Sequence, residues 1–212
     1  MLFRSKGFPA LVYVPNTQSN TVQVYDQKTY KLLRTVKVAR EPQHVVPSYD
    51  LKTLYANSDL GNSLMPFDAK TGKPGKRIPL LDPYNLYFTP NGKYAVVMQE
   101  RMKQIAFADP HTFKIKKTLK TKCAGVNHAD WTADGNIFIA SCEFSGTIIE
   151  VNTAKMKIIN EQFIPDTYAK HSASTHDGLP NLGPQPQDVK LSPDGKYFYI
   201  ADMMSDGIWK MP

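Results

Sequence analysis

Residues 84–120 read YNLYFTPNGKYAVVMQERMKQIAFADPHTFKIKKTLK, and this stretch decides the fold class. It divides into four pieces of strand length, which are 84–89, 93–99, 103–109 and 113–120. The Pro-Asn-Gly turn between the first two pieces favours a tight hairpin, because Asn and Gly tolerate the positive φ angles that such turns need. The stretch therefore predicts a small antiparallel β-sheet of four strands.

The same pattern repeats along the chain, and two landmarks show its period. Apolar runs end in a carboxylate or amide residue at spacings of 42, 41 and 43, at Asp26, Asp68, Asp109 and Asn152. Turns between strands recur at spacings of 41, 43 and 60, at Asp50, Asn91, Asp134 and Asp194. Four strands in a period of about 42 residues are typical of a propeller blade. The sequence predicts an all-β protein, a β-propeller with about four to five four-stranded blades.

The period also predicts the domain boundaries. Residues 1–8 are expected to be a non-native or unstructured start, because residues 1–5 match the translated end of a common sequencing adapter. The rest, 9–212, is expected to be propeller. The expected parts are a partial blade 1 (9–40), blade 2 (41–82), blade 3 (83–121), blade 4 (122–164), an insert (165–185) and a partial blade 5 (186–212).

Three segments, 11–16, 19–26 and 186–201, resemble the YVTN-type β-propeller repeat. The second blade departs from this repeat, because it turns on Tyr49-Asp50-Leu51. The resemblance implies a propeller of about seven blades, of which this chain is a fragment truncated at both ends. The missing blades of the same protein would then be its first partner, and open sheet edges would favour self-association.

Polar residues stand just before each innermost strand. Loops that lead into innermost strands and loops that join second to third strands share one face of a propeller, the mouth, where ligand-binding groups are expected. Eight polar or amphipathic residues map to this face, in the pairs Gln43 and His44, Tyr84 and Asn85, Asn127 and His128, and Gln187 and Asp188. They either form a binding site or cap the channel through ordered water.

The insert brings two further histidines, His171 and His176, to the same face, whereas His111 maps to the opposite one. Histidine titrates near neutrality and is a common metal ligand. The spacing of these two histidines matches no zinc pattern, and the segment is rich in Ser, Gly and Pro. The alternatives are a solvated loop and a metal or haem site.

Cys123 and Cys142 are the two cysteines of the chain. Counting back through the turn at Asp134 places Cys142 opposite residue 126, so the two thiols lie within reach of a disulfide. A disulfide would fit a secreted or periplasmic protein. Two unpaired buried thiols are the alternative, and neither cysteine belongs to a haem-attachment motif.

The net charge of +7 comes largely from lysines in or just after turns of the repeat. Lysines distributed in this way favour a solvated outer rim that discourages edge-to-edge aggregation. No arginine stripe with interleaved aromatic residues suggests nucleic acid. Apolar runs of five or six residues are too short for a transmembrane helix. We therefore expect no nucleic acid partner and no membrane span.

The sequence contains no phosphate-binding glycine loop, zinc-protease motif or nucleophile elbow. Carboxylates near the mouth, Asp59, Glu100, Glu143 and Asp202, are expected to be acids of surface loops, with an acid–base pair as the alternative.

The preferred hypothesis is therefore an extracytoplasmic, periplasmic or secreted scaffold without cofactor, which binds a protein or small ligand at its mouth and is not an enzyme. Two further hypotheses follow from related propellers. One is an oxidoreductase-like propeller that holds haem, or a divalent metal, through His44, His128, His171 and His176. The other is a propeller lactonase in which carboxylates and histidines at the mouth support ring opening. Whether the chain is an enzyme is left open by its sequence.

Overall fold

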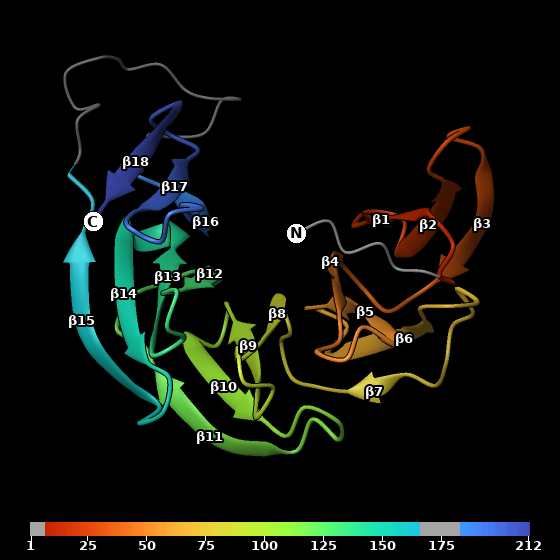
Figure 1. Ribbon diagram of the computed structural model, residues 1–212, viewed down its shortest axis with the longest axis horizontal. Helices are drawn as coiled ribbons and strands as arrows, with labels where there is room; N and C mark the ends of the chain where they lie inside the picture. The colour runs from red at the N-terminus through yellow and green to blue at the C-terminus, as the bar shows by residue number, and fades with distance from the viewer. Residues whose placement is uncertain (1–6, 166–182) are drawn as a thin grey trace. The chain divides into compact units, whose positions relative to one another are not determined.

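The computed structural model describes residues 7–165 and 183–212 (Figure 1). His171 and His176 lie outside these residues. The described part is almost entirely β-structure, in antiparallel sheets with the strand orders β1-β2-β3, β4-β5-β6-β7, β11-β10-β9-β8, β12-β13-β14-β15 and β16-β17-β18. We call these sheets blades 1 to 5 in chain order. The predicted all-β propeller fold is confirmed, and within the described residues no helix is long and apolar enough to cross a bilayer.

The chain divides into two compact units, residues 1–88 and 89–212. The first unit contains β1 (Leu11–Asn16), β2 (Thr21–Asp26), β3 (Leu32–Lys37), β4 (Pro42–Pro47), β5 (Thr53–Ser58), β6 (Ser63–Asp68), β7 (Ile78–Pro79) and β8 (Asn85–Phe88). Its core lies between blades 1 and 2, where Val22 and Val38 pack against Ala56 and Phe67.

The described residues of the second unit form a short 3-10 helix, η1 (Glu143–Ser145), and ten strands. These are β9 (Ala95–Gln99), β10 (Gln104–Ala108), β11 (Ile115–Lys120), β12 (Val126–Trp131), β13 (Ile137–Cys142), β14 (Thr147–Asn152), β15 (Lys157–Phe163), β16 (Pro186–Leu191), β17 (Phe198–Asp202) and β18 (Gly207–Met211). Its core includes Ile139 and Ile148 of blade 4, packed against Val189, Phe198 and Ile200 of blade 5.

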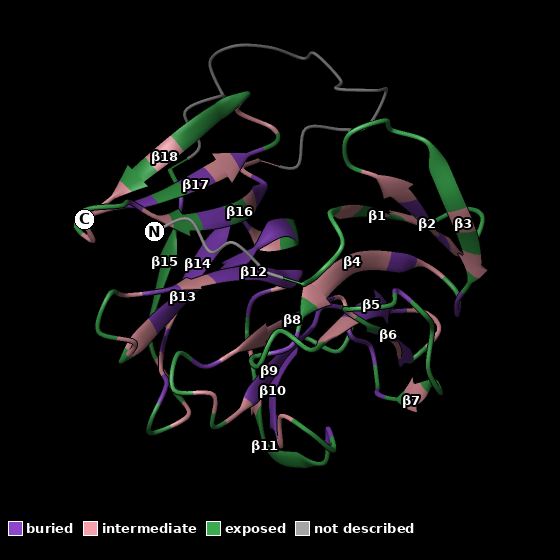
Figure 2. Ribbon diagram, turned by 45° about the vertical axis from the view of Figure 1, so that its right-hand side comes forward, coloured by how far each residue is buried: buried purple, intermediate pink, exposed green. Residues whose placement is uncertain are grey.

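Burial follows the position of each strand within its blade (Figure 2). All five residues of β9 and of β10 are buried, whereas the outermost strand β11 is mostly exposed and carries three of the rim lysines. A strand that is buried on both faces is apolar at nearly every position. This pattern explains why the sequence shows continuous apolar runs rather than alternation.

Two side-chain turns repeat with the period. In the first, a Ser or Thr hydroxyl donates to a carboxylate or amide oxygen two residues on, as from Thr89 to Asn91 at 2.8 Å and from Thr132 to Asp134 at 2.6 Å. In the second, the Asp109 carboxylate accepts from the backbone N–H and hydroxyl of Thr112 and from the N–H of His111. Such turns fix the hairpins that set the repeat.

Candidate functional site: the mouth of blade 4

The innermost strands are irregular where the sequence places the mouth residues. Pairing shifts by one residue between Pro42 and His44 in β4, between Val126 and Ala129 in β12, and between Pro186 and Val189 in β16. A bulge of this kind interrupts the ladder and redirects side chains, and bulges are frequent beside functional sites. Three of the predicted mouth pairs lie at these bulges: Gln43–His44, Asn127–His128 and Gln187–Asp188. No feature of the amino-acid composition indicates the bulges.

In the first unit the mouth residues bond to neighbouring protein groups. The Nδ1 atom of His44 lies 3.0 Å from the Tyr84 carbonyl oxygen, and the two rings meet edge to face at 5.3 Å. Asn85 is buried and donates to the hydroxyl of Tyr87 at 2.8 Å, while its Oδ1 accepts from the N–H of Leu86. Gln43 is half-buried. The contacts of His44, Tyr84 and Asn85 therefore stabilise the first unit locally.

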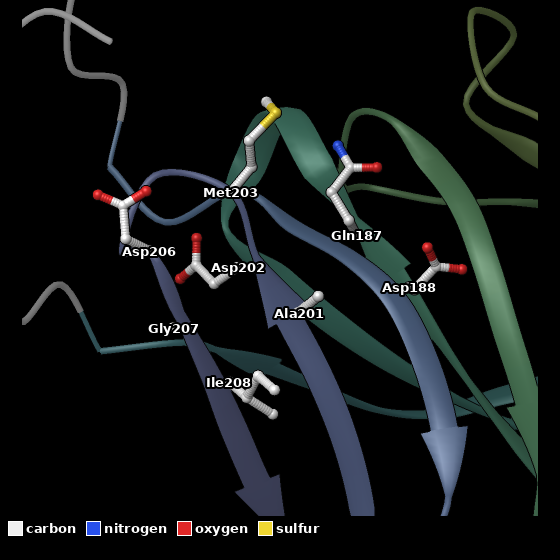
Figure 3. A pocket seen from close by; sticks show the side chains of 8 residues that line it. All are labelled: Gln187, Asp188, Ala201, Asp202, Met203, Asp206, Gly207 and Ile208. Atoms are coloured by element: carbon white, nitrogen blue, oxygen red, sulfur yellow. The ribbon is translucent and has the colours of Figure 1, made fainter.

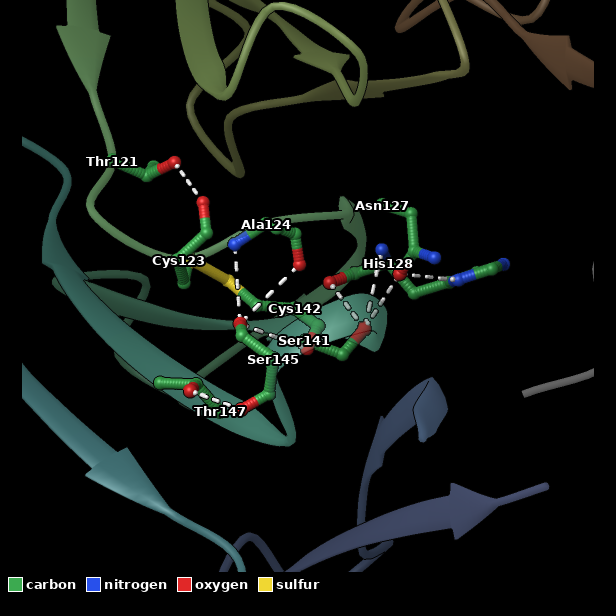
Figure 4. The surroundings of a disulfide bond; sticks show 9 residues. All are labelled: Thr121, Cys123, Ala124, Asn127, His128, Ser141, Cys142, Ser145 and Thr147. Atoms are coloured by element: carbon green, nitrogen blue, oxygen red, sulfur yellow. Dashed lines mark hydrogen bonds between the residues drawn. A yellow bond between two sulfur atoms is a disulfide. The ribbon is translucent and has the colours of Figure 1, made fainter. Parts of the chain in front are cut away.

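In the second unit Asn127 links two carboxylates. Its amide nitrogen donates to Glu143 Oε2 at 2.7 Å and to Glu100 Oε1 at 3.3 Å. Its Oδ1 accepts from the Ser141 hydroxyl at 2.9 Å and lies 3.1 Å from His128 Nδ1 (Figure 4). A side-chain amide has two donor hydrogens and two acceptor lone pairs, so all of its hydrogen-bonding capacity is used. We call Glu100, Asn127, His128, Ser141, Glu143 and Gln187 the mouth cluster.

Glu143 is the buried acid of the mouth cluster. Glu143 is the first residue of η1 and is only 8% exposed. Burial raises the pKa of its carboxyl, and hydrogen bonds from Gln187 and Asn127 oppose that rise. Both of these partners are neutral amides, which stabilise a carboxylate less than a cation would. Glu143 therefore holds its proton more readily than an acid on the surface.

His128 is oriented by Asn127. Because the Asn127 oxygen can only accept, Nδ1 of His128 donates to it, and the other ring nitrogen, Nε2, faces Asp188 Oδ1 at 3.8 Å. The His128 side chain is 8% exposed and that of Asp188 is 71% exposed. The mouth residues of blades 4 and 5 thus meet at this contact.

A hollow of about 580 Å³ adjoins the mouth cluster. Its lining includes Gln187 and Asp188 of β16 and, from the end of β17 through β18, Asp202, Met203, Asp206 and Ile208 (Figure 3). Gln187 belongs to both features, because it lines the hollow and also bonds to Glu143. Polar groups and exposed apolar groups face the same space, as in many small-molecule sites.

The acids expected on surface loops are instead buried. Asp59, Glu100 and Glu143 occupy one repeat position, nine residues after the turn residue of their blades, and all are less than 9% exposed. Asp202 comes one position earlier in its blade and bonds to the backbone N–H of Gln185 and to the indole of Trp209. The spacing of the three acids, 41 and 43 residues, is a signal that sequence reasoning missed.

Cys123 and Cys142 form a disulfide next to the mouth cluster, with their Cα atoms 5.9 Å apart (Figure 4). Cys142 ends β13 and pairs with Val126, and both cysteines are buried. The disulfide therefore joins the loop leading into β12 to the turn that carries Glu143.

The haem or metal hypothesis stays a prediction, because its candidate ligands His171 and His176 lie outside the described residues. The described residues contain no group of three or more His, Cys, Asp or Glu side chains that could hold a metal ion. The Nδ1 atoms of His44 and His128 contact protein oxygens, and Nε2 of His128 faces a carboxylate.

The repeated antiparallel sheets of three or four strands define the chain as a β-propeller. The model of the YNCE-like β-propeller family matches residues 4–159, so the chain belongs to that family. Among solved structures, it is similar to a chain of Kuenenia stuttgartiensis hydrazine synthase, with a TM-score of 0.72 and 19% identity. The match covers 91% of this chain and 52% of the hydrazine synthase chain. This chain therefore spans about half the length of that structure. No curated protein matches.

Proposed function

We propose that this chain is part of an extracytoplasmic propeller that binds a small ligand through the mouth cluster without catalysing a reaction. YNCE-like propellers are typically extracytoplasmic. The observation that carries the proposal is Glu143, a buried carboxylate that accepts from the neutral amides of Asn127 and Gln187, of which Gln187 also lines the hollow. A volume of about 580 Å³ suits a small molecule.

The chemistry of the cluster favours a ligand with N–H donors, such as an amine. Gln187 is half-buried and reaches both the hollow and Glu143, so a ligand that displaces its amide would contact the carboxylate. A cationic donor would form a stronger, charge-assisted hydrogen bond there than the neutral amide does. The ligand would thereby favour the ionised form of Glu143.

Side-chain amide NMR tests this proposal with putrescine as the amine and glycerol as the neutral polyol. Putrescine is expected to shift the signals of Asn127 and Gln187, and Glu143→Gln is expected to abolish the shift. Gln43→Ala in blade 2 is the matched control and should leave it unchanged. Absence of any shift with both compounds would refute small-ligand binding and leave a protein partner as the remaining hypothesis.

A propeller lactonase is the second candidate, because a buried carboxyl with a raised pKa suits a general acid or base. Glu143 would then take a proton from the water that attacks the lactone carbonyl carbon, and would return that proton to the alkoxide released when the ring C–O bond breaks, which gives a hydroxy acid. A panel of γ- and δ-lactones tests this candidate. Turnover that is lost in Glu143→Gln would support it, and no turnover by the full-length protein would exclude it.

A further inference from the structure

The disulfide lies close in sequence to both members of a short hydrogen bond in the mouth cluster, between Asn127 and Glu143. Cys142 immediately precedes Glu143, and Cys123 precedes Asn127 by four residues. The disulfide and the 2.7 Å Asn127–Glu143 hydrogen bond therefore join the same two short segments, 123–127 and 142–143. Movement of either cysteine would displace one partner of that hydrogen bond relative to the other.

The backbone ladder does not hold Asn127 in place. Pairing between β12 and β13 is interrupted between Val126 and Ala129, so the register leaves Asn127 and His128 without regular partners. A side chain fills part of the gap, because the N–H of His128 donates to the Ser141 hydroxyl at 3.3 Å. At a bulge the ladder hydrogen bonds are interrupted, so the position of a side chain there depends on other contacts of that strand.

The loop before β12 is fixed to η1 by several contacts around the disulfide. The N–H of Glu143 donates to the carbonyl oxygen of Gly125 at 3.0 Å. The N–H of Phe144 donates to the carbonyl oxygen of Ala124 at 3.1 Å. The Ser145 hydroxyl accepts from the Ala124 N–H at 3.1 Å. Gly125 has a φ of 79°, and a Cβ there would lie 2.8 Å from the Phe144 nitrogen. The disulfide is thus the covalent member of a close loop-to-turn contact.

We propose that the Cys123–Cys142 disulfide positions Glu143 and Asn127 for ligand binding, and that its reduction releases the mouth cluster while the sheet of blade 4 stays folded. A dithiol reductant supplies two electrons and two protons, the Sγ–Sγ bond breaks, two thiols form, and the reductant becomes a disulfide. The reduced loop then depends on its hydrogen bonds alone. This inference rests on the proposed ligand-binding function, because it concerns the same cluster.

Hydrogen exchange and carboxyl NMR test the positioning role without any ligand. Oxidised protein, protein reduced with dithiothreitol and the Cys123→Ser/Cys142→Ser variant are compared. On loss of the disulfide, amides of 143–145 should exchange faster by about tenfold or more, whereas those of Phe138 and Ala140 should keep their protection. The raised pKa of Glu143 should return toward its ordinary value, and reoxidation should restore it.

Ile149→Val is the control, because it weakens the core of blade 4 without touching the disulfide. It should leave the titration of Glu143 unchanged. Unchanged exchange at 143–145 in both reduced forms would overturn the proposal. Uniform loss of protection across blade 4 would also overturn it, since the disulfide would then only stabilise the fold.

Putrescine binding separates this inference from the proposed function. Tight binding to oxidised protein that weakens by about tenfold on reduction would support both. If putrescine does not bind but exchange and titration change as expected, the positioning role stands and the proposed ligand fails. If putrescine binds equally to both redox forms, the positioning role is wrong and the binding site stands.

Discussion

The mouths of blades 2 and 4 share one backbone and differ in side chains. In each, the innermost strand carries a bulge, and the acid that follows the second strand donates its N–H to the preceding loop, from Asp59 to Glu41 at 3.2 Å and from Glu143 to Gly125 at 3.0 Å. In each, a residue with positive φ, Glu41 or Gly125, precedes the innermost strand. The repeat therefore reproduces the scaffold of the mouth in both units.

The side chains placed on that scaffold lead to different contacts. In blade 2 the Asp59 carboxylate accepts from the adjacent N–H of Leu60. In blade 4 the longer Glu143 reaches the amides of Asn127 and Gln187. The disulfide of blade 4 is replaced by Ala39 and Ser58, and the buried Ser58 hydroxyl has no hydrogen-bond partner among the described residues. The comparison shows that one repeat position serves local structure in one blade and a linked polar cluster in another.

The largest expected effect comes from removing the central amide of blade 4. Asn127→Ala leaves Glu143 buried without its 2.7 Å hydrogen bond from Asn127 and should lower the free energy of unfolding by about 3 kcal/mol. Urea denaturation measures this change. The equivalent change in blade 2, Gln43→Ala, should cost no more than about 0.5 kcal/mol. Equal costs would show that the two mouths do not differ in the way the contacts indicate.

Introducing a disulfide at the equivalent positions of blade 2 tests whether the two mouths share the same backbone geometry. Ala39→Cys/Ser58→Cys places cysteines at the positions equivalent to Cys123 and Cys142, with the same separation of 19 residues. Under oxidising conditions the new cross-link should stabilise the chain by about 2 kcal/mol. Denaturation with and without reductant measures the gain, after mass spectrometry establishes bond formation. A loss of stability in the oxidised variant would mean that the two loops differ in geometry.

The pH dependence of Glu143→Gln isolates the buried acid. Because the folded-state pKa of Glu143 is raised by burial, the stability that its protonated form contributes is present at low pH and is lost as pH rises through that pKa. The variant does not titrate, so its stability relative to wild type should increase from about pH 4 to pH 8. Urea midpoints across this range measure the trend, and a flat difference would contradict the burial of Glu143.

The smallest effect is expected in the outer turns. Hydrogen bonds from the Thr112 backbone, His111 and the Thr112 hydroxyl lower the pKa of the exposed Asp109 carboxyl. The stability it contributes is therefore present above its unfolded-state pKa and is lost as pH falls through the folded-state value. Asp109→Asn should be slightly destabilising at pH 7, and the difference should shrink toward pH 2.5. Asn152→Asp, at the equivalent turn of blade 4, should show the opposite sign.

The parts of the site that depend on residue spacing from a hairpin turn could be predicted from the sequence. The turn at Asp134 fixed the hairpin register, which placed Cys142 opposite residue 126 and so brought Cys123 within reach. The same count placed Asn127 and His128 at the mouth. The bulge between Val126 and Ala129 could not be predicted, because a register shift depends on pairing across the sheet rather than on local composition.

The sequence by itself determined the all-β blades, since turn residues and apolar runs act locally and recur with one period. Only the tertiary structure decided which polar residues meet. Asp59, Glu100 and Glu143 share one repeat position, yet their environments depend on the length of each side chain and on what the neighbouring strands present. Glu143 meets Asn127, 16 positions away across the bulged hairpin of its own sheet, and Gln187, 44 positions away on the neighbouring sheet. These contacts depend on strand pairing and on packing between sheets, which no local pattern encodes.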